Sequence, residues 1–185
     1  MATADPIDFL RPLPRVQLGT LASLLPAEVC IVEPLRVVTL RCLPGSDAAL
    51  AAAASPLPGP SSFTGKDPLL VWRSPGEWLH IGTRDEAADA LLQALLPGGS
   101  AHATDLSAGL ILFELRGPAL DALLPRLLDA SVQLAEPGQG TRARLADIAV
   151  VALRHAPDRL WLLADRANDH YLAHWLAYAT NAIRS

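Results

Sequence analysis

The stretch LLVWRSPGEWLHIG, residues 69–82, is the clearest indicator of the fold. Each half is rich in apolar, branched and aromatic side chains, and the Ser-Pro-Gly sequence between the halves is typical of a tight turn. The stretch therefore predicts a β-hairpin. Its second strand begins with Glu77 and Trp78, and an acid beside a large aromatic side chain can belong to a catalytic site, a ligand platform or ordinary hairpin packing.

A second stretch, VVALRHAPDRLWLLADRANDHYLAHWL at residues 150–176, aligns with the first hairpin and the segment after it without a gap. Residue 150 falls on residue 69, an offset of 81. The matching pairs are Arg73 with Arg154, Glu77 with Asp158, Leu79 with Leu160, Leu91 with Leu172 and Leu95 with Leu176. Both copies predict a strand, a turn, a strand and then a helix whose apolar residues recur at helical spacing. Asp165 is the expected N-cap of the second helix.

A further strand and helix precede each hairpin. Residues 35–54 predict a strand, a turn at Gly45 and an alanine-rich helix. Residues 110–128 predict the same order, with Gly117 and Pro118 opening the helix. The order strand-helix-strand-strand-helix therefore occurs twice. We also expect two irregular connections, rich in proline and glycine, at residues 55–68 and 135–141.

This order of elements predicts an α+β fold of two pseudo-symmetric split βαβ lobes of the ferredoxin-like kind. Each lobe would have one sheet with its helices on one face. The lobes would span about residues 35–96 and 110–183 of a single domain, residues 29–185. Residues 1–28 are broken by prolines and are expected to form an N-terminal arm.

Composition excludes several classes of function. The 15 basic and 19 acidic residues are spread along the chain, so no basic stripe favours nucleic acid and no polybasic segment favours anionic lipid. No apolar run reaches the ~18 residues of a membrane span, and the N-terminus lacks a secretory signal. Cys30 and Cys42 are too few for a disulfide framework. We therefore expect a cytoplasmic protein with reduced thiols.

Neither a catalytic site nor a metal site is predicted. His170 and His174 have a spacing that suits a metal, but no third ligand is evident, so a solvated helix edge is the favoured interpretation. Ser107 stands outside any nucleophile-elbow motif, and hydrogen bonds between it and Asp105 at a strand entry are expected instead. No pair of carboxylates stands out as an acid and base couple.

Alternation along the strands points to an interface. In EWLHIG, Leu79 and Ile81 should face the helices, which places Trp78 and His80 on the opposite side of the sheet. By the alignment, Trp161 lies on that same side in the second copy. An apolar face of this kind is rare on a monomer, so we expect the other lobe or a partner subunit to cover it. Trp78, His80 and Trp161 are therefore the interface candidates.

These segments resemble a known family. LVWRSPGEWLHIG resembles the W-x-G-P-D-E-W-L hairpin of the gamma subunit of heterotetrameric sarcosine oxidase. VVTLRCLPG and SPLPGPSSFTGKDP resemble the family's first strand end and its proline-rich connector. DLSAGLILFELRGPALDALLPRLLDASVQL, GTRARLADIAVVALR and ADRANDHYLAHWLAYA correspond to later segments of the family, and the likeness covers about residues 30–180.

The resemblance implies a fold, a role and partners. The gamma subunit is similar in fold to the folate-binding domain of the glycine-cleavage T-protein, which has two lobes of this kind. The complex of that family oxidises sarcosine to glycine and passes the one-carbon unit to tetrahydrofolate, using FAD, FMN and NAD on its large subunits. The implied partners are the larger alpha and beta subunits and a small delta subunit, with this chain non-catalytic and holding no cofactor itself.

The chain departs from the related patterns in two places. The family hairpin has Gly-Pro-Asp before Glu-Trp, whereas this chain has Ser-Pro-Gly. The T-protein carries a paired-acid GG-x-x-DD pattern, whereas this chain has GQGTRARLADIAV, in which only Asp147 is retained and Arg142 and Arg144 are added. Folate catalysis is therefore disfavoured, although the arginines could meet the glutamate tail of a folate.

Three functions follow as hypotheses. The leading one is a non-catalytic gamma subunit of a sarcosine-oxidase-type complex. The alternative is a free-standing tetrahydrofolate-binding or aminomethyltransferase-like protein, with Asp147, Arg142 and Arg144 as its folate contacts. A maintenance factor for iron-sulfur enzymes is the third, and the missing K-G-C-Y-x-G-Q-E stretch counts against it.

Overall fold

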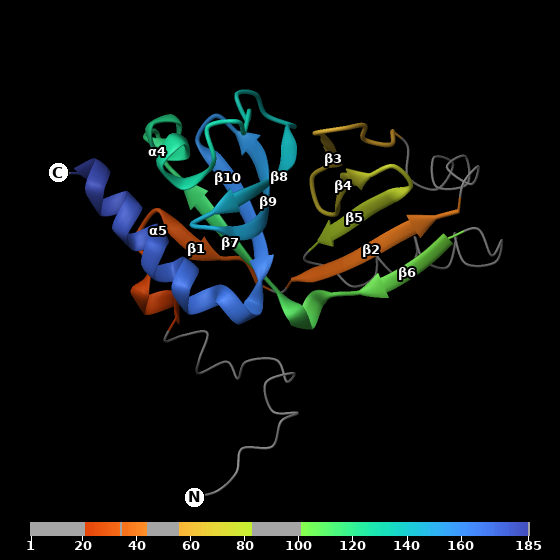
Figure 1. Ribbon diagram of the computed structural model, residues 1–185, viewed down its shortest axis with the longest axis horizontal. Coiled ribbons are helices and arrows are strands. Elements are labelled where there is room, and N and C mark those ends of the chain that lie inside the picture. The colour runs from red at the N-terminus through yellow and green to blue at the C-terminus, as the bar shows by residue number, and fades with distance from the viewer. Residues whose placement is uncertain (1–20, 34, 44–55, 83–100, 185) are drawn as a thin grey trace, which may run out of the picture.

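Two antiparallel sheets of five strands each lie side by side in the computed structural model (Figure 1). Helices α4 (Leu120–Leu127) and α5 (Asp169–Arg184) cover the face of one sheet that points away from the other sheet. The chain is thus a mixed α and β protein built on two antiparallel sheets. The structure describes residues 21–33, 35–43, 56–82 and 101–184.

The first sheet contains the predicted hairpin, which is confirmed. β4 (Leu69–Ser74) pairs with β5 (Glu77–Gly82), and Pro75 and Gly76 form the turn between them. Gly76 has a φ of 74°, and a proline followed by a residue with positive φ is the combination that a type II turn requires. The strand order is β3-β4-β5-β2-β6, with β2 at Arg36–Cys42, β3 at Phe63–Gly65 and β6 at Ala101–Asp105.

The second sheet has the order β8-β9-β10-β7-β1. Its strands are β1 (Val29–Ile31), β7 (Leu110–Arg116), β8 (Gly140–Leu145), β9 (Ile148–Ala156) and β10 (Arg159–Asp165). The predicted strand and helix at residues 110–128 and the second hairpin are confirmed as β7, α4, β9 and β10. Asp165 caps the 3-10 turn η4 (Arg166–Asn168), where it accepts a hydrogen bond from the backbone N–H of Ala167, and α5 begins only after this turn.

Both sheets contain strands that the sequence pattern did not predict. β1 precedes β2 along the chain yet forms the edge of the second sheet beside β7, and β6 precedes β7 yet forms the edge of the first sheet beside β2. β3 lies within the connection expected at residues 55–68, and β8 begins in the one expected at residues 135–141. The helices predicted after Gly45 and over residues 88–96 lie outside the described residues.

Three clusters of buried apolar residues hold the sheets and helices together. The outer core lies between the second sheet and its helices, and includes Phe113, Leu160, Leu162, Leu172 and Leu176. The central core lies between the two sheets and consists of Val37, Leu69, Val71, Leu79, Ile81, Leu112, Leu153, Trp161 and Leu163. The far core lies on the face of the first sheet that points away from the second, and consists of Val38, Leu40, Leu70 and Trp78.

The predicted direction of the side chains in the first hairpin, with Leu79 and Ile81 toward the helices, was wrong. Leu79 and Ile81 belong to the central core, so they point at the second sheet, whereas Trp78 belongs to the far core. Trp161 does point at the opposite lobe, as predicted. Trp78 and Trp161 therefore lie on non-equivalent faces, and the predicted shared aromatic face does not exist.

The error arose from a slip of one residue in the alignment of the two hairpins. Next to the turn, Trp78 pairs with Trp72 in the first hairpin, and Leu160 pairs with Arg154 in the second. Leu160 is therefore the equivalent of Trp78, and Arg154 is the equivalent of Trp72, which gives an offset of 82 residues. The equivalent of Leu79 is therefore Trp161. Because side chains alternate between the faces of a strand, a slip of one residue moves every side chain to the wrong side.

Candidate functional site

The two lobes join along a seam made by their edge strands. The backbone N–H of Phe63 donates to the carbonyl of Gly138 at 3.1 Å, and the N–H of Gly140 donates to the carbonyl of Ser61 at 3.0 Å. A Cβ at Gly140 would lie 2.6 Å from a methyl group of Leu153 on β9 and 3.2 Å from the ring of Phe63 on β3, so glycine leaves room for the Phe63 ring at the seam. The seam closes one end of the space between the two sheets.

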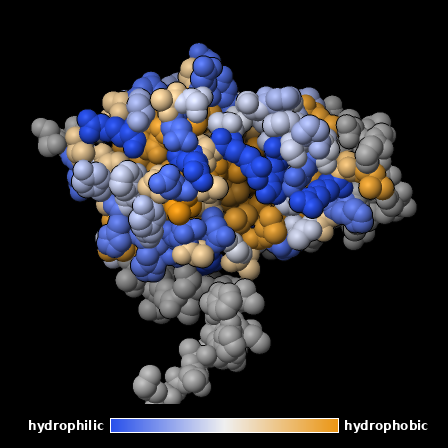
Figure 2. Space-filling view, in the orientation of Figure 1, coloured by the Kyte–Doolittle hydropathy of each residue, from blue (hydrophilic) through white to orange (hydrophobic). Residues whose placement is uncertain are grey.

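A cleft of about 250 Å³ opens between the lobes on one side of this space. Figure 2 shows it as an apolar hollow crossed by a band of hydrophilic side chains, near the middle of the visible face. The cleft is lined by Arg73, Leu79, Leu106, Leu110, Arg142, Ala149, Val150, Val151, Leu163, Ala164 and Asp165. Its floor is thus apolar and continuous with the central core, and its charges stand at the rim.

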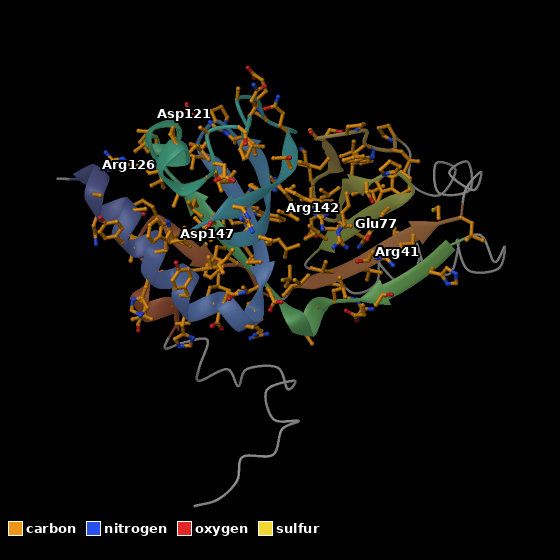
Figure 3. All side chains as sticks on the ribbon, in the orientation of Figure 1. Arg41, Glu77, Asp121, Arg126, Arg142 and Asp147 are labelled. Carbon is orange, nitrogen blue, oxygen red and sulfur yellow. The ribbon has the colours of Figure 1, made fainter. Side chains whose placement is uncertain are left out.

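Arginines on facing lobes dominate the rim of the cleft. Arg73 comes from β4 of the first sheet and donates to Glu77 at 2.8 Å, while Arg142 comes from β8 of the second sheet. Among the described residues, Arg142 has no salt-bridge partner. In Figure 3, Arg142 stands on one side of the gap between the lobes, and Glu77 and Arg41 stand on the other. The rim therefore offers a free guanidinium group to an anionic ligand.

Glu77 is a fixed carboxylate at this rim and carries no proton near neutral pH. Partial burial acts to raise its pKa, but Arg73 beside it and hydrogen bonds from Ser74 and Arg41 outweigh burial and hold the pKa below its usual value. Since a general acid must hold a proton at the working pH, Glu77 does not suit that role. The adjacent residues Glu77 and Trp78 instead stabilise the hairpin. Trp78 is buried in the far core, where its indole N–H donates to the carbonyl of Pro58 at 3.2 Å.

A second polar cluster lies at the end of β7 and centres on Glu114, whose side chain is 1% exposed. Its carboxylate accepts hydrogen bonds from Trp161 Nε1 at 2.6 Å and from Arg159 Nε at 2.5 Å, and it also accepts one from Arg116. Burial acts to raise the pKa of Glu114, and these three donors lower it further than burial raises it. Cys30 Sγ also donates weakly to this carboxylate at 3.9 Å. Glu114 is therefore a buried anion that ties β7 to β10, and its hydrogen-bonding positions are occupied by groups of the chain itself.

An aromatic stack links this cluster to the seam. The ring of His155 lies 4.2 Å from the ring of Trp161 and 5.0 Å from the ring of Phe63, which belongs to the opposite lobe. Burial lowers the pKa of His155 to about 4, and the nearby positive charge of Arg159 acts in the same direction. His155 is therefore a neutral ring at physiological pH, and it acts as packing between the lobes.

The predicted folate contacts do not form one site. Arg142 lines the cleft, whereas Arg144 lies 3.9 Å from Asp147 at the exposed turn between β8 and β9. The side chain of Asp147 is 95% exposed, and its backbone has a φ of 68°. Figure 3 shows Asp147 apart from Arg142, so only Arg142 can contribute to binding in the cleft.

The three interface candidates are all buried within the chain. Trp78 and Trp161 are each 5% exposed, and His80 is 3% exposed. Burial lowers the pKa of His80, with a further contribution from the charge of Arg36. None of the three side chains is therefore exposed for direct contact with a partner.

The remaining sequence candidates behave as local structure. Ser107 donates through Oγ to Asp105 at 2.6 Å and accepts from the backbone N–H of Val37 at 2.9 Å, which confirms the hydrogen bonding expected at this strand entry. His170 Nδ1 lies 2.8 Å from Asp169. Across the described ranges, no three side chains are grouped so that they could hold a metal ion, and no helix is long and apolar enough to cross a membrane.

The sequence analysis did not identify Glu114, which joins β7 to β10, or His155, which packs between the lobes. A signal existed for the acid, because Glu114 interrupts the apolar run LILFELR within a strand predicted to be buried. Its donors, however, lie 45 and 47 residues away in the sequence, on a strand that only the fold brings alongside.

Comparison with known proteins identifies relatives over most of the chain, although no family model matches the sequence. A sarcosine oxidase subunit gamma from an Arthrobacter species is 30% identical over 156 residues, which cover 80% of this chain and 77% of that protein. A chain of the heterotetrameric sarcosine oxidase from Corynebacterium sp. U-96 superposes with a TM-score of 0.78 at 23% identity, covering 92% of this chain and 94% of that one.

The expected likeness to the T-protein fold is also confirmed. The glycine cleavage system aminomethyltransferase T from Bartonella henselae superposes with a TM-score of 0.60 at 14% identity. The match covers 85% of this chain and 47% of that protein. At these identities the two structures establish a shared fold and carry no information about activity.

Proposed function

Because the chain belongs to the family of sarcosine oxidase gamma subunits, we propose that it is a non-catalytic subunit of a heterotetrameric sarcosine oxidase that oxidatively demethylates sarcosine. The observation that carries this proposal is the 30% identity to a gamma subunit across 80% of this chain and 77% of the relative. A match over most of both chains ties the role to the whole protein and not to a shared fragment.

The polar groups of the chain support a structural role. Glu77 and Glu114 are the half-buried and buried acids on the sheets, and arginines hold both of them as carboxylates with lowered pKa values. His155 is half-buried as a neutral ring. A catalytic acid or base needs a pKa near the working pH and an open position beside the substrate, and none of these three groups offers both.

The proposal extends to partners, cofactors and location. The partners would be the alpha, beta and delta subunits of the complex, and FAD, FMN, NAD and tetrahydrofolate would bind to those chains. Neither Cys30 nor Cys42 forms a disulfide, which fits a reducing compartment and supports a cytoplasmic complex.

We also propose that the domain, residues 29–185, consists of two ferredoxin-like lobes related by a pseudo-twofold axis. An arm at residues 1–28 would precede it, with Leu21 of that arm packed into the outer core. The equivalent strand orders β6-β2-β5-β4-β3 and β1-β7-β10-β9-β8 support the symmetry. The bridge between Ser62 and Gln139 supports a position for the axis at the seam, because these two residues occupy equivalent positions immediately before β3 and β8.

Reconstitution tests the function. The isolated chain should be colourless and should not turn over sarcosine, whereas coexpression with the other subunits of the source organism's sarcosine oxidase should yield one complex that contains it. A chain that binds flavin or oxidises sarcosine alone would contradict the non-catalytic role. Failure to enter the complex would contradict the subunit role.

The cleft supports folate binding as the second candidate function. Its apolar floor can accept a flat ring, and Arg142 is free to meet a carboxylate. Calorimetric titration of the isolated chain with tetrahydrofolate tests it, with Arg142→Ala as the site variant and Arg126→Ala, on the exposed face of α4, as the matched control. Micromolar affinity that is lost only in Arg142→Ala would favour the free-standing folate protein over the subunit.

A further inference from the structure

Helix α5 has an outer face whose composition is unusual for a surface exposed to water. From His170 to Ile183 the sequence HYLAHWLAYATNAI contains no Asp, Glu, Lys or Arg. The inner face of the helix, through Leu172 and Leu176, packs into the outer core. The opposite face carries aromatic and neutral polar side chains where a solvated helix normally carries charges.

The aromatic side chains of this face form a stripe. Tyr171, Trp175 and Tyr178 follow one another at spacings of four and three residues, which places them along one side of a helix. Tyr171 is 52% exposed, Tyr178 is 67% exposed, and Trp175 is half-buried between them. In the described part of the chain, Leu43 is the one other exposed large hydrophobic residue, at 48%. Exposed aromatic surface is thus concentrated on α5.

The stripe is held in place before any partner binds. The rings of Trp175 and Tyr178 lie 5.7 Å apart in a tilted arrangement. The hydroxyl of Tyr171 donates to the carbonyl of Ala146, in the turn between β8 and β9, at 3.5 Å. Pre-ordered aromatic side chains lose little conformational entropy on binding, which is one reason why tyrosine and tryptophan anchor protein interfaces.

From these features, and resting on the proposed function, we infer that the outer face of α5 is the surface by which this chain docks onto another subunit of the oxidase. Interface centres are depleted of charged residues and enriched in aromatic ones, and α5 shows both properties. The matching surface on the partner should be neutral and apolar, with acceptors for the two tyrosine hydroxyl groups.

The position of α5 agrees with this assignment. It lies on the side of the second sheet that points away from the first sheet, so a subunit docked there would leave the cleft between the lobes open (Figure 1). A standard interface needs about 800 Å² from each partner. The two tyrosines supply only part of that area, and the exposed side of α4 next to α5, which carries Asp121 and Arg126, would supply a polar rim.

The test compares charge substitutions at three exposed hydrophobic sites in the coexpressed complex. The double variant Tyr171→Glu/Tyr178→Glu places charges in the centre of the proposed interface. Leu43→Glu is the matched control, at a similarly exposed site immediately after β2. All three side chains are exposed, so each isolated variant should melt within a few degrees of the wild-type chain. Affinity for the remaining subunits should fall at least ~30-fold in the double variant and stay unchanged in the control.

The possible outcomes separate the two proposals. If the wild-type chain fails to join the complex, the proposed function falls. If the wild-type chain and the double variant both join with equal affinity, the subunit role stands and the docking face is wrong. Sedimentation and hydrogen exchange of the isolated chain test whether a second copy or residues 1–20 bind to this face instead. A wild-type dimer that the double variant abolishes would assign the face to a second copy, and an α5 that becomes exposed to hydrogen exchange only when residues 1–20 are deleted would assign it to that segment.

Discussion

Replacing Glu114 by alanine should lower the free energy of unfolding by about 3 kcal/mol. The substitution removes the acceptor of Trp161 Nε1 at 2.6 Å and leaves a buried indole N–H without a partner, which costs about 1–3 kcal/mol. It also removes charged hydrogen bonds from Arg159 and Arg116. These two side chains are 41% and 64% exposed, so water can replace the lost acceptor, and their contribution should be about 1 kcal/mol.

Two further variants make this estimate specific. Glu114→Gln keeps an oxygen for the indole N–H and loses only the charge, so it should cost about half as much as Glu114→Ala. Asp147→Asn is the control, because its carboxylate is 95% exposed and 3.9 Å from its nearest cation, and it should stay within about 0.5 kcal/mol of the wild type. Urea unfolding followed by tryptophan fluorescence measures all three.

The expected decrease in melting temperature for Glu114→Ala is about 6–12 °C, from about 2–4 °C per kcal/mol in a chain of this size. The folded pKa of Glu114 is below its unfolded value of about 4.3, so its contribution is complete above that pH and disappears as the pH falls through the folded pKa. The difference between wild type and variant should therefore shrink in acid. An alanine variant within 0.5 kcal/mol of the wild type at pH 7 would refute the role of Glu114 as the tie between β7 and β10.

Three other perturbations test the packing. Trp78→Ala truncates a side chain that is 5% exposed in the far core and should cost about 3–5 kcal/mol in a denaturant melt, whereas a near-native midpoint would contradict its burial. The pKa of His155 is lowered to about 4, so the folded chain should lose stability as the pH falls from about 6.5 to 4. His155→Phe should weaken this dependence of the unfolding free energy on pH. If the dependence is unchanged in the variant, other groups cause it. Gly140→Ala should cost about 1–3 kcal/mol because its Cβ would lie 2.6 Å from Leu153 and, across the seam, 3.2 Å from the ring of Phe63. Gly109→Ala, with nothing within 4 Å, is the control, and equal effects of the two substitutions would argue against a tight seam.

Local pattern was sufficient for the hairpins and for one strand and helix. The turn at Pro75 and Gly76 is recognisable because proline and glycine restrict or permit particular backbone angles whatever their surroundings. The runs of apolar and aromatic residues beside the turns likewise predicted β5 and β10 as strands. The hydrogen bonds between Ser107 and Asp105 were predictable for the same reason, because the two residues are near neighbours in the chain.

The tertiary structure alone decided which way those strands face and which strands are neighbours. Trp78 and Trp161 came out on non-equivalent sides because strand pairing, and not sequence identity, sets the register of the two hairpins. β1 and β6 escaped prediction because a short edge strand is stabilised by its neighbour in the sheet, which lies far along the chain. The Glu114 cluster arises in the same way, since its partners reach it only across paired strands. Secondary structure follows from interactions within a few residues and can be predicted from local pattern. The direction in which side chains face, the cleft and the ion clusters depend on contacts between distant segments, which local pattern does not reveal.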